Sequence, residues 1–234
     1  MINVATVIAG ALLGTILGSR LPEKLRHTVV AGLGVFTLAL GVKMFFNTQN
    51  SLIVVGALLI GSLLGEWWRI EEGIQGIGRW LEKRFMPQNG GSTQSRFVRG
   101  FLSASLLFCI GPMAILGSIQ DGLTGDYSTL AIKSLMDGFA AMAFASSLGI
   151  GVLFSFLPVL VYQGGISMLA QQVQAVVTQP MMNEMTATGG VMLLALSISS
   201  LLEIKPIRVG NFLPALIIAP LIVAILAGLG VNLP

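Results

Sequence analysis

The sequence predicts an all-α membrane protein that crosses the bilayer several times. Its 234 residues are 54% hydrophobic and only 10% charged, whereas a soluble domain carries about 25% charged residues. The mean hydropathy is +0.87, and charges this scarce cannot cover the outside of a water-soluble globule. Charge-free apolar runs of about 15 to 26 residues recur along the chain, and about 20 helical residues cross a bilayer core. The bulk of the chain is therefore expected to face lipid.

We expect about eight membrane-spanning helices. A bilayer core of about 30 Å requires about 20 helical residues, and each apolar run is long enough, the first only just. The sixth run is the least apolar, because residues 162–165 (Tyr-Gln-Gly-Gly) dilute it. The expected spans are residues 2–19, 28–46, 51–68, 98–119, 128–156, 158–177, 185–203 and 210–231.

The positions of the basic residues favour eight spans over seven. With eight spans, all the lysines and arginines except Lys43 and Lys133 fall on one side of the membrane, as the positive-inside rule requires of the cytoplasmic side. If the fifth and sixth spans were one, Lys205 and Arg208 would change sides. Eight spans place both termini outside. The first span has its positive charges after the apolar run, the reverse of a signal peptide, so we expect it to be retained.

Residues 66–86 differ from the other segments. Apolar side chains recur there at spacings of three and four, with charged residues between them, which is typical of an amphipathic helix at the membrane interface. Such a helix serves either as a collar that anchors the third span or as a gating or docking arm. A flexible linker is expected at residues 86–96, where Pro, Asn and Gly cluster. The linker divides the chain into residues 1–85, with three spans and the amphipathic helix, and residues 97–234, with five spans.

Two pairs of spans have similar sequences. Residues 31–40 align without a gap with residues 187–196, and residues 57–60 align with residues 215–218. Helices in each pair would cross the membrane in opposite directions, as in the inverted repeats of many secondary transporters. The similarity therefore reflects either an inverted repeat or, alternatively, the chance recurrence of Leu, Ala and Gly.

Small residues form stripes on two predicted helices. Gly10, Gly14 and Gly18 lie four residues apart, and Gly61 and Gly65 repeat this spacing. Such stripes let helix backbones approach closely. They serve either packing within one chain or the seam of a homodimer.

The fourth span contains a predicted helix break. Pro112 has no amide hydrogen and clashes with the carbonyl group four residues earlier. Backbone groups freed in lipid must find partners in protein or in a water-filled cavity. The break is therefore either a simple kink or part of a discontinuous helix that lines a polar site. The candidate residues around it are Gly111, Pro112, Ser118, Gln120, Asp121, Thr124 and Asp126.

The fifth span carries two charges inside the expected bilayer. Lys133 and Asp137 are four residues apart, so they share a helical face and can pair. Asp137 lies roughly 13 Å from the start of the helix at 1.5 Å per residue. A carboxylate at that depth is costly and usually marks a substrate or ion path, although the pair also has a purely structural reading. Asn211 opens a second broken helix, predicted near residues 214–220 from Pro214 and Pro220.

Several functional classes are excluded by composition and motifs. The single cysteine and the single histidine exclude an internal disulfide and a multi-cysteine or His-rich metal site. The methionines around Glu184 are read as packing and not as a soft-metal site. There is no Walker loop and no HExxH motif, so we expect no enzyme and no cofactor other than coupling H⁺ or Na⁺. The net charge of only +3 gives no reason to expect nucleic acid.

Several short segments resemble one known family. They are Thr124-Gly125-Asp126, Lys133-Ser134 with Asp137, Phe144-Ala145, residues 147–150, Gly189-Gly190 and residues 213–216. Together they resemble the bacterial YqgA-like family, small inner-membrane proteins with a domain of unknown function. The likeness covers nearly the whole chain and is most specific over residues 108–150. It implies a protein of the bacterial cytoplasmic membrane, generally regarded as a transporter, and supplies no substrate or site.

Our preferred hypothesis is a small secondary transporter, homodimeric, that moves a small solute or ion coupled to H⁺ or Na⁺. The acidic residues suit a cationic or zwitterionic solute, while Lys133 argues for an anion. The alternatives are a scaffold or regulatory subunit that does not transport, and an ion channel. The expected substrate or ion ligands are Gly111, Pro112, Ser118, Gln120, Asp121, Thr124, Asp126, Lys133, Asp137 and Asn211.

Overall fold

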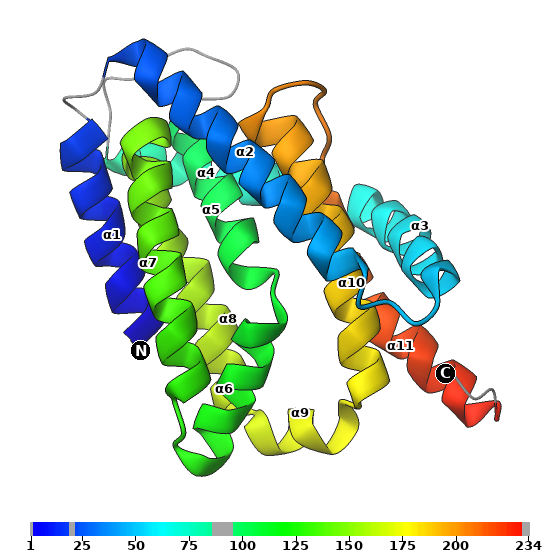
Figure 1. The fold of residues 1–234 in the computed structure, drawn as a ribbon. Helices are drawn as coiled ribbons and strands as arrows, with labels where there is room; N and C mark the ends of the chain where they lie inside the picture. Colours follow the sequence, from blue (N-terminus) through cyan, green and yellow to red (C-terminus); the bar gives the residue numbers. More distant parts are fainter. Residues whose placement is uncertain (1, 19–21, 86–95, 231–234) are drawn as a thin grey trace. The chain divides into compact units, whose positions relative to one another are not determined.

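The computed structural model describes residues 2–18, 22–85 and 96–230, and the part of the chain it describes is helical without strands. The predicted class, an all-α polytopic membrane protein, is confirmed. Figure 1 shows the helices in order along the chain. They are α1 (Ile2–Gly18), α2 (Glu23–Phe45), α3 (Ser51–Trp68), α4 (Ile70–Phe85), α5 (Arg96–Cys109), α6 (Pro112–Thr124), α7 (Ser128–Leu148), η1 (Ile150–Ser155), α8 (Phe156–Met168), α9 (Ala170–Val176), α10 (Gln179–Leu196), η2 (Ser197–Leu201), η3 (Val209–Phe212) and α11 (Ala215–Gly228).

Five helices among the described residues are long and apolar enough to cross a membrane: α2, α3, η1 with α8, α10 with η2, and η3 with α11. A sixth span is obtained if α5 and α6, bent by 61°, are counted together. The predicted total of eight also requires α1, an apolar helix of 17 residues, and α7. The eight-span topology therefore stays a prediction, while the multi-pass character is clear.

The chain forms two compact units. The first comprises residues 1–34 and 74–171, and the second comprises residues 35–73 and 172–234. The predicted linker at residues 86–96 lies outside the described residues, except for Arg96, the first residue of α5. The division into residues 1–85 and 97–234 stays a prediction.

Several predicted boundaries are wrong. The fifth span was expected to run to residue 156, but α7 ends at Leu148, because Gly149 has a φ of 84°, in the left-handed region that favours glycine. The amphipathic helix was expected over residues 66–86. It covers only Ile70–Phe85, because Arg69 has a φ of 52° and separates α4 from the end of α3. Trp67 and Trp68 therefore belong to α3.

The core of the first unit is the close packing of α1 against α7, the two helices that lie side by side in Figure 1. A Cβ atom added at Gly10, Gly14 or Gly18 would lie 2.1–2.2 Å from a carbonyl oxygen of α7. Only glycine permits this approach. The first glycine stripe thus serves packing within the chain, and it does not support a dimer seam.

A second cluster in this unit joins the amphipathic helix to the helices beside it. Leu81 of α4 packs with Phe97 and Phe101 of α5 and with Phe154 of η1, and all four are buried. Trp80, the residue before Leu81, is exposed. This arrangement fits the collar interpretation, in which an apolar stripe of α4 packs against the bundle.

The second unit is built on α3, α10 and α11. Ala57 of α3 packs against Ala215 and Ala219 of α11. The second glycine stripe is also used inside the chain, because a Cβ atom at Gly65 would lie 2.0 Å from the carbonyl oxygen of Asn211. Ala57 and Ala215 are equivalent in the predicted repeat. The helices differ, however, because α3 is continuous whereas η3 and a turn precede α11, so the inverted repeat stays a prediction.

The predicted break near residues 214–220 lies at one end of that range. The chain turns at Leu213 and Pro214, and α11 begins at Ala215. Pro220 lies inside α11 without ending it. The second proline therefore does not form part of the break.

Candidate functional site

Three buried polar side chains meet between α1 and α7 in the first unit. The Nζ atom of Lys133 lies 2.5 Å from Oδ2 of Asp137, one helical turn further along α7. Asn3 of α1 donates from Nδ2 to the same carboxylate oxygen at 2.9 Å. The exposed fractions are 6% for Lys133, 8% for Asp137 and 2% for Asn3. The ammonium and the amide together compensate a carboxylate that is removed from water.

The glycine stripe explains why Asn3 reaches Asp137. Gly10 lies against the carbonyl group of Gly138, the residue after Asp137. Gly138 in turn lies against Thr6 of α1. Because the backbones touch here, the short side chain of Asn3 spans the remaining gap. The close packing of α1 on α7 therefore positions the polar group.

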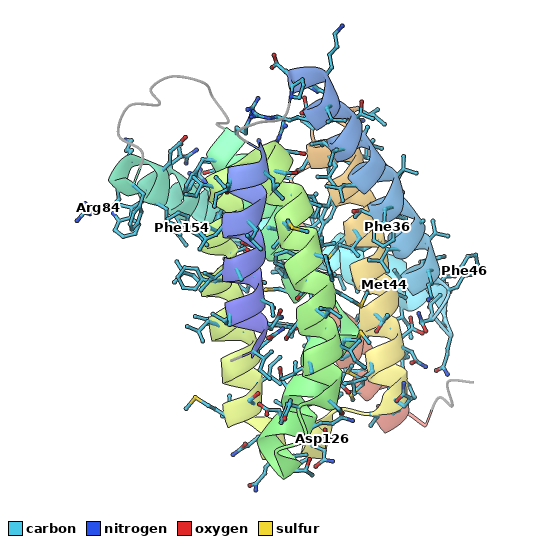
Figure 2. All side chains as sticks on the ribbon, turned by 60° about the vertical axis from the view of Figure 1, so that its left-hand side comes forward. Phe36, Met44, Phe46, Arg84, Asp126 and Phe154 are labelled. Atoms are coloured by element: carbon cyan, nitrogen blue, oxygen red, sulfur yellow. The ribbon has the colours of Figure 1, made fainter. Side chains whose placement is uncertain are left out.

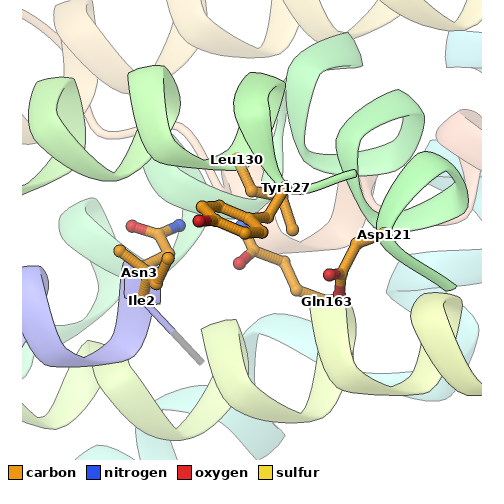
Figure 3. A pocket seen from close by; sticks show the side chains of 6 residues that line it. All are labelled: Ile2, Asn3, Asp121, Tyr127, Leu130 and Gln163. Carbon is orange, nitrogen blue, oxygen red and sulfur yellow. The ribbon is translucent and has the colours of Figure 1, made fainter. Parts of the chain in front are cut away.

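A cavity of about 130 Å³ lies beside Asn3. In Figure 3 its wall is formed by side chains from α1, α6, the start of α7 and α8. Two buried polar atoms of lining residues have no partner in the described part of the chain: Oδ1 of Asn3 and Nε2 of Gln163. Unpaired buried polar atoms are rare in folded proteins. The lining residues are Ile2, Asn3, Asp121, Tyr127, Leu130 and Gln163.

Asp121 contributes a carboxylate to the cavity wall. It is half-buried on α6, and its Oδ2 atom accepts a hydrogen bond from Oγ of Ser167 on α8 at 3.3 Å. The neighbouring Gly122 allows this approach, since a Cβ atom there would lie 2.1 Å from the carbonyl oxygen of Ser167. Among the salt bridges found in the described residues, none involves Asp121. Of the residues expected from the sequence, Asp121 alone belongs to the lining set.

Three other predicted ligands form the turn between α6 and α7 instead. Oε1 of Gln120 accepts from Oγ1 of Thr129 at 2.8 Å, and Thr124 donates to the carbonyl oxygen of Gln120 at 2.9 Å. Asp126 accepts from the backbone N–H of Ser128 at 2.9 Å, and this hydrogen bond lowers the pKa of its carboxyl group below the usual 3.8. Figure 2 shows Asp126 at the tip of this turn. These side chains are exposed and stabilise the turn.

The residues at the helix break lie outside the lining set. Gly111 has an extended backbone (φ −168°) before α6, and its N–H donates to the carbonyl oxygen of Cys109 at 3.1 Å. α6 then begins at Pro112. Ser118 is fully buried on α6, and its Oγ atom has no partner in the described part of the chain. The break redirects α6, which carries Asp121.

Asn211 belongs to the second unit, where both ends of its amide are engaged. Oδ1 accepts from the backbone N–H of Glu71 at 2.8 Å, and Nδ2 donates to Oε2 of Glu66 at 2.5 Å. Glu71 also accepts from the N–H of Gly210 at 2.6 Å, and Arg208 pairs with Glu66. The network ties the end of α3 and the start of α4 to η3.

Glu184 of α10 is a buried carboxylate whose part in the fold the sequence did not indicate. It is 1% exposed. It accepts from Oγ1 of Thr48 at 2.6 Å and from the backbone N–H groups of Gln49 and Asn50 at 2.7 and 3.0 Å. These groups precede α3, so the carboxylate holds the α2–α3 connection within the second unit. The nearby methionines Met181 and Met182 are buried, consistent with packing.

The sequence analysis missed Asn3, Tyr127 and Gln163 as site residues. A signal was present for two of them, since Asn3 and Gln163 are isolated polar residues within apolar runs. Polar residues in such runs usually face the interior of the bundle. Tyr127 gave no signal, because an aromatic residue at the end of a span is equally typical of the membrane interface.

Comparison with known proteins gives a family. Residues 1–224 match the family model described as "Protein of unknown function (DUF554)". The chain is 34% identical to the uncharacterized protein YqgA of Escherichia coli (strain K12) over 218 residues, which covers 93% of this chain and 92% of that protein. It is 28% identical to the uncharacterized membrane protein YdfK of Bacillus subtilis (strain 168) over 234 residues, 98% of this chain and 97% of that protein. No solved structure matches. The chain therefore belongs to the DUF554 family, as its resemblance to YqgA-like proteins indicated.

Proposed function

We propose that this protein is a small secondary transporter of the bacterial inner membrane that moves a small solute or ion coupled to H⁺ or Na⁺. The observation that carries this proposal is the cavity in the first unit. It is lined by the Asp121 carboxylate and by two buried polar residues, Asn3 and Gln163, in a chain with only 10% charged residues. Polar cavities within a membrane-spanning bundle usually mark a substrate or ion path.

The geometry also supports movement of helices around the site. The cavity is bounded by α6, which follows the 61° bend, and by α8, which is followed by the short helix α9. Discontinuous helices beside a polar site are a common construction of secondary transporters. By contrast, α1 and α7 are in backbone contact at three glycines. We therefore expect α1 and α7 to move as one body, with α6 as the element that opens the cavity.

The remaining expectations form part of the same proposal. The protein is not an enzyme, needs no cofactor besides the coupling ion, and works in the lipid bilayer as a homodimer with both termini outside. The glycine stripes do not support the dimer, since both are packed within the chain. A scaffold or regulatory subunit and an ion channel are the competing functions.

Flux in proteoliposomes tests the proposal. Purified protein is reconstituted with an internal pH-sensitive dye, and candidate solutes are added outside with and without a Na⁺ gradient. The matched variants are Asp121→Asn, which removes the charge from the cavity, and Glu23→Gln, which removes an exposed charge at the start of α2. We expect solute-dependent, gradient-coupled flux in the wild type and in Glu23→Gln that is lost in Asp121→Asn. Flux that no gradient influences would favour a channel, and no flux in any protein would favour the scaffold.

A further inference from the structure

We infer that the exposed side of α4 binds the headgroups of anionic lipids, so that the protein gathers negatively charged lipid at one end of its first unit. This interaction goes beyond the proposed function and does not depend on whether the protein transports a solute. Three properties of α4 point to it: which of its sides is buried, the charge on its exposed side, and its direction relative to the apolar helices of the unit.

One side of α4 is fixed against the first unit. Leu81 is buried in a cluster with Phe101 of α5, and a Cβ atom added at Gly78 would lie 3.2 Å from the ring of the same phenylalanine. Gly78 and Leu81 are three positions apart, so they share one helical face. With this face against α5, the residues on the other side of the helix are free to meet a partner outside the unit.

The free side of α4 carries three cations. Arg79, Lys83 and Arg84 are exposed, and none of them forms an ion pair with another described residue. Figure 2 shows Arg84 at the end of α4, directed away from the other helices. The acidic residues of α4 do not offset these charges, because Glu82 is buried and Glu72 lies about 10 Å before Arg79 at about 1.5 Å per residue. The free side of α4 is therefore complementary to an anionic partner.

Two large apolar side chains distinguish a lipid surface from a soluble anion. Ile77 and Trp80 are 54% and 64% exposed, and Trp80 is four positions before Arg84, on the same face. A soluble anion would pair with the cations and leave both apolar side chains in water. At a bilayer surface, tryptophan lies at the level of the headgroups, apolar side chains enter the acyl boundary, and basic side chains meet the lipid phosphates. A lipid surface therefore satisfies every kind of side chain on this face.

The direction of α4 agrees with a position at the bilayer surface. Figure 2 shows α4 running across the view, whereas α1 and α7 run along its height. Apolar side chains of α1 and α7 are exposed, including Ile16 and Phe139 at 61% each, so we expect these two helices to cross the bilayer. A helix that runs across them lies in the plane of the membrane. Figure 2 also shows Arg84 and Asp126 toward opposite ends of the unit, so α4 is near one of its two ends.

Tryptophan quenching by brominated lipids tests the inference on the full-length protein, in vesicles of phosphatidylcholine with about 30% phosphatidylglycerol. The chain has three tryptophans, and Trp67→Phe with Trp68→Phe leaves Trp80 as the reporter. Bromine is carried either by the phosphatidylglycerol or by an equal amount of the phosphatidylcholine. One Lys or Arg near the surface favours anionic lipid by about 5-fold. We therefore expect anionic lipid to be about 5-fold denser around Trp80 than neutral lipid at the same mole fraction.

Two variants and a salt titration test the part of the cations. Arg79→Gln, Lys83→Gln and Arg84→Gln together should make quenching by the two lipids equal, while the matched control Arg79→Lys with Arg84→Lys should keep the preference. Raising the salt from about 0.1 M to about 1 M shortens the Debye length from about 10 Å to about 3 Å and should reduce the preference in the reporter protein.

The reporter protein alone can overturn the inference, so the result does not depend on whether the other variants fold. Equal quenching by the two lipids at low salt would refute the selection of anionic lipid. No quenching by either lipid would show that Trp80 lies away from the bilayer, and the free side of α4 would then be a surface for a protein or a soluble anion. A preference that survives in the triple glutamine variant, with its helix content unchanged by circular dichroism, would refute the role of the three cations.

Discussion

The buried pair of Lys133 and Asp137 makes a quantitative prediction about stability. Asp137→Leu removes one partner and leaves an ammonium with an 8% exposed side chain and no carboxylate beside it. Removing one partner of a buried ion pair costs about 3–5 kcal/mol. The amide of Asn3 loses its acceptor as well, which adds about 1–3 kcal/mol. The single variant should therefore be destabilised by about 4–8 kcal/mol in total.

The double variant Lys133→Met with Asp137→Leu should recover most of this loss. Replacing a buried ion pair by apolar side chains of similar volume is often neutral or stabilising. The unpaired amide of Asn3 remains, so we expect a residual loss of about 1–3 kcal/mol. A triple variant that also carries Asn3→Leu should lose none of this remaining stability, because it contains none of the three polar side chains.

Unfolding in mixed detergent micelles, followed by circular dichroism, measures these differences. For a chain of this length about 1 kcal/mol shifts the melting temperature by about 2–4 °C. The single variant should thus melt at least about 8 °C below the wild type. A double variant whose loss of stability equals the sum of the losses for Asp137→Leu alone and Lys133→Met alone would refute the reasoning, because the charges would then not be coupled. A single variant within about 1 kcal/mol of wild type would mean that water solvates Lys133.

Three further predictions follow from other parts of the structure. Gly14→Val should separate α1 from α7, since its Cβ would lie 2.1 Å from the carbonyl oxygen of Met142. The loss of stability, more than about 3 kcal/mol, should appear as a lower melting temperature. The control Gly32→Val should change the melting temperature little, because a Cβ at Gly32 meets nothing within 4 Å. Glu184→Ala removes the acceptor of Thr48 Oγ1 and of the Gln49 N–H, whereas the Asn50 N–H keeps Thr48 Oγ1 as an acceptor. The variant should cost about 2–5 kcal/mol in the same unfolding assay, and a cost below about 1 kcal/mol would contradict the buried geometry. The pKa of Asp126 is lowered by the Ser128 backbone N–H, so its contribution to stability is complete above its unfolded value of 3.8 and is lost as the pH falls below that value. The difference in melting temperature between wild type and Asp126→Ala should therefore shrink as the pH is lowered from 6 to below 3.8, and a difference that grows on acidification would contradict this sign.

Composition and spacing predicted the features that depend on local sequence. Scarce charge predicted the all-α membrane class, which is confirmed. The spacing of Lys133 and Asp137 placed both on one face of α7, where they meet. The structure also has a break at the Gly111–Pro112 step, where proline cannot continue the α-helical hydrogen bonds.

Features that depend on contacts between distant segments were not predictable in the same way. Asn3 became a site residue through a contact with a residue 134 positions away, and nothing in its local sequence names that partner. Asp121 and Asp126 are equally acidic and only five positions apart. The fold separates them, because α6 ends between them at Thr124 and is followed by Gly125, which has a φ of 71°. One carboxylate thus lines the cavity and the other caps a turn.

The central claim is that the cavity in the first unit opens alternately to the two sides of the membrane. Cys109, the single cysteine of the chain, is replaced by serine, and Leu130→Cys introduces a thiol into the cavity wall. A membrane-impermeant maleimide is then applied to right-side-out and to inside-out vesicles. We predict labelling from both sides, with opposite changes in the two rates when a coupling gradient is imposed. Labelling from one side only, or from neither, would contradict alternating access and the transporter assignment.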